Sequence, residues 1–292
     1  MDEKAHIFEE HRRLLEGLAY RMLGTLADAQ DVVQDTYLKW SRADLSGIDN
    51  PRSWLVTVCS RLALDQLKSA RVRRETYVGP WLPEPFVDEP SPDDRLRADE
   101  TVSLALMLAL EKLSPAERAA FLLHEVFGYR FDEIAAILNK SEAACRKLAS
   151  RARAAVQADK PRFQATPEEH QRLLDAFLKA AHAGDLNRLQ TVLSEAVELH
   201  ADGGGKVPTA PEILRGADAV ARFFVRVMHD QRPASASTRI VTRWFNGVPG
   251  ILVYEDGRLV VALSAAIESG RIHRIYALRN PDKLAAFEKR NG

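Results

Sequence analysis

Several features that mark whole classes of protein are missing from this sequence. Its 292 residues include two cysteines, Cys59 and Cys145, each inside a helical pattern and far from a second cysteine or a cluster of histidines. This spacing supports neither a disulfide nor a zinc site and predicts reduced, buried thiols. No apolar run approaches the roughly 20 residues that span a bilayer. The first ten residues, MDEKAHIFEE, are charged, so we expect no signal peptide, no membrane contact and a cytoplasmic location.

The sequence also has no excess of charge of one sign, because 41 Lys and Arg residues balance 41 Asp and Glu residues. It has no Walker-type phosphate loop and no metal-binding triad, so we predict no nucleotide hydrolysis, no metal and no cofactor. The charge is unevenly distributed along the chain, which is more informative than the sum. Residues 61–74 hold five bases and one acid, whereas residues 84–100 hold seven acids and two bases, a net charge of −5.

What is present begins with a helix-turn-helix pattern in residues 114–156. Ser114-Pro115, with an acid two residues after the proline, predicts an N-cap and a helix start. Apolar spacing predicts a second helix over 131–138, and residues 139–141 form a tight break before a third. The third helix is basic and carries small residues, which suits a major groove, where its cations would reach phosphates and guanine edges. A solvated basic helix on an ordinary bundle is the alternative for this segment alone.

Three amphipathic helices are predicted upstream, over residues 6–23, 27–40 and 51–74. The second exposes acids and a glutamine opposite its apolar stripe. Acids near a helix start favour the helix dipole, and the same face is suited to docking a basic partner helix. The third carries Trp54 and ends in the basic run, a combination that suits gripping a DNA strand and stacking on unpaired bases. Core packing is the alternative for Trp54.

These segments together resemble a known family. DAQDVVQDTYLKW (28–40), NPRSWLVTVCSRLALDQLKSARVRR (50–74) and LSPAERAAFLLHEVFGYRFDEIAAILNKSEAACRKLASRARAAV (113–156) resemble regions 2 and 4 of sigma-70 family factors of the extracytoplasmic-function (ECF) group. The resemblance implies a sigma factor that directs transcription initiation, with core RNA polymerase and promoter DNA as partners. It implies region 2 over residues 1–75 and region 4 over residues 101–158.

The resemblance also implies roles for individual residues. Asp31, Gln34 and Asp35 would face the β′ clamp helices of polymerase. The helix of residues 51–74, with the loop before it, would recognise and melt the −10 element, although Arg61 departs from the asparagine of many members. The implied −10 contacts are Trp54, Arg61, Lys68, Arg71, Arg73 and Arg74, and the implied −35 contacts are Arg146, Lys147, Ser150 and Arg151.

Between the two DNA-binding units lies an acidic, proline-rich segment, residues 76–100. Its five prolines forbid a continuous helix and favour an extended path. Trp81, Leu82 and Phe86 make it too apolar for an idle spacer. Two interpretations stay open, a linker pinned to its neighbours and a regulated docking motif.

After a second linker, residues 159–169, the pattern changes to that of an α+β domain over residues 170–292. Asp256-Gly257 and Ser269-Gly270 are hairpin signals between strand-like runs. Helices with a curved antiparallel sheet make an α+β cone, which resembles the SnoaL-like, nuclear transport factor 2-like (NTF2-like) fold. The expected fold class is therefore multidomain, with two all-α sigma domains followed by this cone. The predicted strands are 196–201, 238–245, 250–255, 258–267 and 271–278.

Three short motifs, WLPEP (81–85), DGGGK (202–206) and NPDKL (280–284), resemble the signature set of the SigJ-like group, whose sigma factors carry a SnoaL-like extension with a regulatory role. The glycines allow close approach of another chain segment, and we expect Lys206 to pair with an acid such as Glu84. The implied regulatory contacts are Trp81, Leu82, Pro83, Glu84, Pro85, Asp202, Gly203, Gly204, Gly205, Lys206, Asn280, Pro281, Asp282, Lys283 and Leu284.

Two other functions remain as alternatives. The first is a helix-turn-helix regulator that does not bind core polymerase. The second is an isomerase or cyclase with a DNA-binding appendage, in which His200, Asp202, Asp230 or His273 would be the acid–base groups. Fold analogy is a poor warrant for catalysis, so we assign no catalytic residue and expect no enzyme. A small-molecule ligand in the cone is a third candidate partner.

Overall fold

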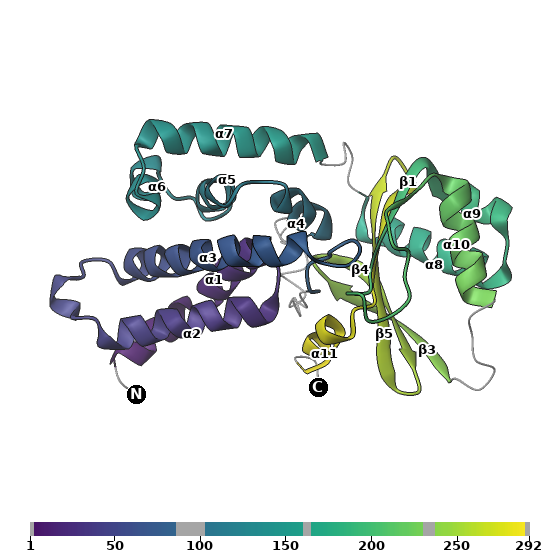
Figure 1. Cartoon of the computed structure of the whole chain (residues 1–292), viewed down its shortest axis with the longest axis horizontal. Helices are drawn as coiled ribbons and strands as arrows, with labels where there is room; N and C mark the ends of the chain where they lie inside the picture. The colour runs from purple at the N-terminus through teal and green to yellow at the C-terminus, as the bar shows by residue number, and fades with distance from the viewer. Residues whose placement is uncertain (1–2, 86–102, 160–164, 230–236, 290–292) are drawn as a thin grey trace. The chain divides into compact units, whose positions relative to one another are not determined.

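The computed structural model describes residues 3–85, 103–159, 165–229 and 237–289 (Figure 1). The chain divides into two compact units, residues 1–76 with 106–159, and residues 77–105 with 160–292. The first unit is helical, and the second contains a six-stranded sheet. Residues 77–85, which we expected within a linker, belong to the second unit. Among the described helices, none is long and apolar enough to cross a membrane.

Three long helices begin the first unit, α1 (Glu3–Leu23), α2 (Leu26–Arg42) and α3 (Pro51–Glu75), as the sequence predicted. A short 3₁₀ turn, Leu45–Gly47, precedes α3. The Asn50 side chain caps the start of α3 by accepting a hydrogen bond from the Ser53 N–H at 3.0 Å. Trp40 is fully buried and donates its indole N–H to the Lys4 carbonyl at 2.8 Å. The core of this bundle contains Phe8, Leu15, Leu18, Met22, Leu55 and Cys59.

The predicted helix-turn-helix follows in the same unit, after a short helix, α4, that was not predicted. Its first helix, α5, starts as predicted, because Ser114 and Glu117 form a reciprocal capping box. The end of that helix was not predicted: it widens into a π turn, where the Phe127 N–H bonds the Leu122 carbonyl at 3.1 Å. Asn139, in a left-handed conformation, ends the next helix, as the predicted break requires. The elements are α4 (Leu104–Glu111), α5 (Pro115–Phe121), the π turn (Leu122–Val126), α6 (Phe131–Leu138) and α7 (Glu142–Asp159).

The second unit is an α+β cone with the sheet order β2-β1-β6-β5-β4-β3. The sheet is mixed and not wholly antiparallel as we expected, because β1 pairs with β6 in parallel. No hairpin joins these two strands, so no tight turn fixes their relative direction. The elements are α8 (Pro167–Ala183), α9 (Leu186–Val192), β1 (Leu193–Asp202), β2 (Leu214–Arg215), α10 (Ala217–His229), β3 (Thr238–Phe245), β4 (Val248–Glu255), β5 (Arg258–Glu268), β6 (Arg271–Leu278) and α11 (Pro281–Lys289).

Three hairpins join the last four strands. The turns at Asp256-Gly257 and Ser269-Gly270 were predicted, and both residues of each have positive φ, as type I′ turns require. The turn at Asn246-Gly247 has the same geometry, with φ values of 52° and 73°. That Asn-Gly pair is an equally strong signal, and the sequence analysis overlooked it.

The core of the cone lies on one face of the sheet. Helices α8, α9 and α10 lie together at that face, and α11 lies elsewhere, against β5 (Figure 1). Aliphatic and aromatic side chains fill the space between helices and sheet, among them Leu174, Phe177, Val197, Ile251 and Ile275, all fully buried. The alternation of side chains along β1 therefore turns His200 and Asp202 to the other face.

Close packing at Gly250 generates a test of this architecture. A Cβ atom there would lie 2.2 Å from Cε1 of the buried Phe245 ring and 3.0 Å from the Leu263 carbonyl oxygen. Gly250→Ala should lower the free energy of unfolding by about 1–3 kcal/mol, because neither neighbour has room to move. Urea titration followed by tryptophan fluorescence measures it. Gly47→Ala, which meets no atom within 4 Å, should stay within about 0.5 kcal/mol of the parent, and equal losses would contradict this packing.

Candidate functional site

The first candidate site is the exposed face of α7. The four residues predicted to contact the −35 element are all exposed. They form two pairs one helical turn apart, Arg146 with Ser150 and Lys147 with Arg151. Cys145, Ala149 and Ala152 are 0%, 2% and 0% exposed and face the rest of region 4. Small residues on the inner side let α7 pack closely on its own domain, so its outer side presents three cations and one hydroxyl. This set suits phosphates and guanine edges.

Neighbouring groups orient two of the arginines on α7. Arg146 forms an ion pair with Glu142, one turn earlier, and its guanidinium lies 5.2 Å from the centre of the Phe131 ring. Arg153 pairs with Glu125, which belongs to the π turn. Both pairs are largely exposed and therefore weak, so a DNA phosphate can replace the carboxylate at little cost.

The second candidate site is the outer face of α2. Asp31, Gln34 and Asp35 are exposed, whereas Val32 and Val33 between them are 2% exposed. Leu38 extends the same face by one turn and is 43% exposed, unusually high for a leucine. The sequence analysis did not select Leu38, although its spacing of seven residues from Asp31 was a usable signal.

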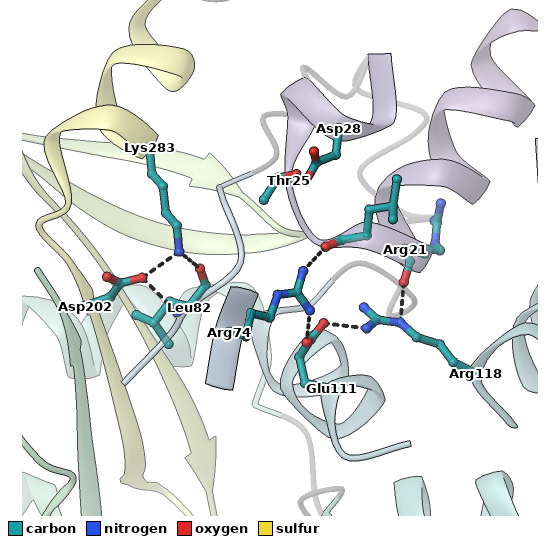
Figure 2. Close-up of polar contacts among 10 residues, drawn as sticks. Arg21, Thr25, Asp28, Arg74, Leu82, Glu111, Arg118, Asp202 and Lys283 are labelled. Carbon is teal, nitrogen blue, oxygen red and sulfur yellow. Dashed lines mark hydrogen bonds and ion pairs between the residues drawn. The ribbon is translucent and has the colours of Figure 1, made fainter. Parts of the chain in front are cut away.

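Asp28, at the start of α2, is not part of that face. Its carboxylate accepts hydrogen bonds from the Thr25 hydroxyl at 2.6 Å and from the Gln66 amide at 2.8 Å. Figure 2 shows Asp28 beside Thr25. Asp28 is therefore a structural residue that joins the start of α2 to α3.

The predicted −10 residues on α3 do not form one exposed face. Trp54 is half-buried, with its ring centre 5.3 Å from that of Trp40, and Lys68 is exposed and paired with Asp65 at 2.8 Å. Arg61 and Arg74 both bond to region 4. Arg71 and Arg73 lie in α3, and their side chains fall outside the described part of the structure.

The third candidate site is in the second unit, where Asp202 ends β1. Its side chain is fully buried and accepts four hydrogen bonds. The donors are the Tyr77 hydroxyl at 2.6 Å, the Leu82 N–H at 2.9 Å, the Gly204 N–H at 3.0 Å and the Lys283 ammonium at 2.7 Å. A carboxylate with these four donors is fully satisfied, so its role is to hold these segments together.

Lys283 is the second centre of this site. Its side chain is 7% exposed, and its ammonium donates to Asp202 and to the Leu82 carbonyl (Figure 2). It also lies 4.4 Å from the centre of the Trp81 ring and 5.0 Å from that of Tyr77. Hydrogen bonds, an ion pair and two aromatic faces together offset the burial of this charge.

Glycines shape the loop that follows Asp202. Gly204 and Gly205 have positive φ, and a Cβ on Gly204 would lie 2.4 Å from the Asn280 amide nitrogen. A Cβ on Gly205 would lie 3.1 Å from the Cβ of Val78. The predicted close approach is therefore present, and the approaching segment is residues 77–85.

The expected pairing of Lys206 with Glu84 is wrong. Lys206 pairs with Asp282 at the start of α11, and Glu84 is buried. The two residues differ in environment, because the Lys206 side chain is half-exposed and Glu84 is 7% exposed.

The three sequence motifs thus meet in one place. We call the six residues at the centre of the contact the linker clasp: Tyr77, Trp81, Leu82, Asp202, Asn280 and Lys283. Their partners Pro83, Glu84, Pro85 and Leu284 are buried, and Pro281 and Asp282 are exposed.

Tyr77 is the member of the linker clasp that the sequence analysis missed. Its hydroxyl donates to Asp202 and accepts from the Asn280 amide at 2.8 Å. Burial, and then the bond to the Asp202 carboxylate, raise the pKa of Tyr77 above its ordinary value. No spacing rule marks a tyrosine that lies outside the WLPEP motif, so only the fold reveals it.

Two of the candidate catalytic groups, Asp202 and His200, already have hydrogen-bond partners. Asp202 is saturated by the linker clasp, and Asp230 lies outside the described residues. His200 bonds Glu198 at 3.1 Å, and burial lowers the pKa of His200 below its ordinary value. His273, on β6, is partly exposed. Among the described residues, apolar side chains form the core between the helices and the sheet.

A groove of about 890 Å³ lies instead along the solvent side of α8. Helix α9 and the hairpin between β3 and β4 form its other walls. Its lining includes three cations, Arg172, Lys179 and Arg188, and two acids, Glu168 and Asp175. The half-buried Trp244 also lines it.

Comparisons with known proteins cover both units. Family models match at residues 7–73 (Sigma-70 region 2) and residues 103–156 (Sigma-70, region 4). The chain is 39% identical over 291 residues to the ECF RNA polymerase sigma factor SigJ of Mycobacterium tuberculosis, covering 95% of this chain and 92% of that protein. It is 35% identical over 286 residues to the probable ECF RNA polymerase sigma factor SigI of that organism, covering 97% and 95%.

The fold agrees with these sequences. A crystal structure of the M. tuberculosis extracytoplasmic-function sigma factor SigJ has a TM-score of 0.73 to this structure, at 35% identity, over 95% of this chain and 97% of that one. The similarity therefore includes the cone as well as the helical unit, and it favours a sigma factor over an isolated helix-turn-helix regulator. The chain belongs to the ECF sigma factors of the sigma-70 family, is similar to SigJ over nearly its whole length, and directs transcription initiation.

Proposed function

We propose that this sigma factor uses three faces to place RNA polymerase at a promoter and uses its cone to control the connection between two of them. The observation that carries the proposal is the linker clasp. It fixes residues 77–85, the beginning of the segment between the −10 helix and region 4, to the cone.

The outer face of α2 is the proposed contact with core polymerase. Asp31, Gln34 and Asp35 supply two carboxylates and an amide, and Leu38 adds an exposed apolar side chain. Such a face fits a basic amphipathic helix, as expected of the β′ clamp helices. Because this partner works in the cytoplasm, the sigma factor acts there too.

Promoter elements meet the other two faces. Arg146, Lys147, Ser150 and Arg151 on α7 read the −35 element, and α3 with its preceding loop recognises and melts the −10 element. Opening the duplex costs a few kcal/mol for each base that leaves the stack. The free energy for this step comes from binding to DNA and polymerase.

The linker clasp controls how far region 4 reaches from region 2 along the chain. When it is closed, the nine residues 77–85 are bound to the cone and cannot extend. Once released, these nine residues can extend to a span of at most about 30 Å. The cone thereby biases the spacing of the two DNA-reading helices. A regulator of this kind needs two states with different contacts, and the open and closed clasp supply them.

The groove along α8 is the proposed site for a small-molecule ligand of the cone. The interior is packed with apolar side chains, whereas the groove offers cations beside an indole ring. Arg172 and Lys179 lie seven residues apart on α8, about 10 Å along the helix. This geometry fits an anionic aromatic molecule.

Substitutions on α7 test the −35 assignment. Arg146→Ala and Arg151→Ala should each weaken binding of holoenzyme to a promoter selected from random DNA by about 1–3 kcal/mol, through loss of contacts to base edges or phosphates. Titration of labelled promoter DNA measures the change. Arg130→Ala is the matched control. Arg130 is exposed in region 4 just before α6, and its side chain forms an ion pair with Asp132 in the first turn of that helix. Unchanged promoter selection by both α7 variants would refute the assignment.

A charge reversal on α2 tests the polymerase contact. Asp35→Lys should weaken binding to core polymerase at least tenfold, because a like charge would face the basic partner helix. Leu38→Ala should weaken it by a smaller factor. Fluorescence titration of labelled sigma factor with core enzyme measures both. Glu10→Lys, at an exposed site on α1, should bind like the parent, and equal affinities for all three variants would rule out this face.

Removal of the Asp202 charge tests the linker clasp. Asp202→Asn leaves the Lys283 ammonium buried without its counter-charge, so it should lower the free energy of unfolding of the cone by about 3–5 kcal/mol. Trp81→Ala removes one aromatic face and should cost less. Both variants should change the yield of in vitro transcription while binding to core polymerase persists. If both variants gave the same yield of transcript as the parent, the linker clasp would have no role in regulation. Lys206→Ala, which breaks only an exposed pair, is the control.

A further inference from the structure

The π turn of region 4 has no part in the proposed function. It interrupts the first helix of the helix-turn-helix with one wide turn, and such turns recur at functional sites. We infer that this turn positions Arg146 for reading the −35 element, acting through the rings of His124 and Phe131. The inference rests on the proposed role of Arg146 at the −35 element.

Arg146 contacts two groups that differ in how they respond to DNA. The Glu142 carboxylate, one turn earlier on α7, pairs with the guanidinium. The centre of the Phe131 ring, at the start of α6, lies 5.2 Å from the same guanidinium. A phosphate or a guanine edge competes with the carboxylate for the N–H donors, whereas the ring contact uses the charge and leaves these donors available. The contact with Phe131 therefore persists when Arg146 binds DNA.

The Phe131 ring is itself held from the π turn. The His124 imidazole lies against it, with the two ring centres 4.1 Å apart and the planes at 31°. Nδ1 of His124 is 3.0 Å from the Tyr129 carbonyl oxygen. A carbonyl oxygen can only accept, so Nδ1 carries the proton and donates it, which fixes the orientation of the imidazole. The half-buried Phe131 ring thus contacts a fixed imidazole and a guanidinium of the DNA-reading helix.

The same turn also contacts a second arginine of α7. Glu125, the residue after His124, pairs with Arg153. Arg146 and Arg153 are seven residues apart, about two turns of an α-helix, so they lie on the same side of α7. The π turn therefore meets that side of the helix at two places, once through the Phe131 ring and once through a carboxylate of its own. Two separate contacts fix the rotation of α7 about its axis better than one.

Positioning matters because arginine has a long and mobile side chain. Its rotamer freedom is lost when the guanidinium makes two hydrogen bonds to a guanine edge. A side chain that a ring already holds loses less freedom on binding, so the contact raises the affinity for the base pair that Arg146 reads without adding a contact to DNA. A cation–ring contact at an exposed site changes an equilibrium constant by about two- to fivefold. Phe131 and His124 are therefore positioning residues that do not touch the base.

Base discrimination by the holoenzyme is the first test. Its affinity for the selected promoter is compared with its affinity for copies in which each −35 base pair is replaced in turn. Arg146→Ala identifies the base pair that Arg146 reads, because discrimination is lost there. Phe131→Leu should lower discrimination at that base pair by about two- to fivefold and leave the other positions as in the parent. Phe131→Tyr is the matched control, because it keeps the ring, and it should keep parental discrimination.

A double variant separates positioning from a general structural effect. Without Arg146 the ring has no guanidinium to hold, so the chain that carries both Phe131→Leu and Arg146→Ala should discriminate like Arg146→Ala alone. Additive losses in the double variant would overturn the inference, because the ring would then act independently of Arg146. An equal loss at every −35 base pair in Phe131→Leu would also overturn it, since that result indicates a displaced or less stable α7.

Mobility of the Arg146 side chain in the full-length chain is the second test, and it needs no DNA. Nuclear magnetic relaxation of the arginine Nε–H groups measures motion on the ps–ns timescale. Phe131→Leu and His124→Ala should both increase the mobility of Arg146. Arg222, which pairs with Asp218 one turn earlier on α10, is the internal control and should be unchanged.

The two tests keep this inference and the proposed function apart. Unchanged mobility of Arg146 in both Phe131→Leu and His124→Ala would overturn the positioning, whatever the DNA measurements give. Parental discrimination by Arg146→Ala at every −35 base pair would instead refute the proposed role of Arg146 at the −35 element.

Discussion

The burial of one carboxylate, Asp202, constrains the second unit more than any other interaction. A charged group without water must receive hydrogen bonds from elsewhere, and the donors here come from three distant parts of the chain. The segment after α3 supplies two of them, the loop after β1 supplies one, and α11 supplies the fourth. The cone is therefore complete only with residues 77–85 in place. The cone and residues 77–85 thus share one hydrogen-bond network.

The helical unit uses charge differently. Its arginines meet a carboxylate, carbonyls and ring faces at positions that range from the exposed Arg61 to the almost fully buried Arg118. Asp202 and Lys283 are almost wholly buried, so their pair is costly to break. Of the two ion pairs, the one between Asp202 and Lys283 is more deeply buried than the one between Arg74 and Glu111.

The cone places its apolar and its polar side chains on opposite faces of the sheet. Apolar side chains fill the space between helices and sheet, and the polar residues of β1 lie on the opposite face. Asp202, which the sequence offered as an acid–base group, is saturated by four donors, and His200 is paired with Glu198. The chemistry of a site depends on which face of the sheet its residues occupy, which is not a property of the fold alone.

Local features were determined by the sequence itself. Capping residues and apolar spacing predicted the helices and the helix-turn-helix, and the Asp256-Gly257 and Ser269-Gly270 pairs predicted two of the hairpins, because these features depend on neighbours within a few residues. The motifs around Trp81, Asp202 and Asn280 indicated that those segments matter together. Tertiary structure alone decided the parallel pairing of β1 with β6, the π turn, the place of Tyr77 in the linker clasp and the pairing of Lys206 with Asp282. It also decided that Arg61 and Arg74 meet region 4, since contacts between residues tens of positions apart depend on how the elements pack and leave no periodic signal in the chain.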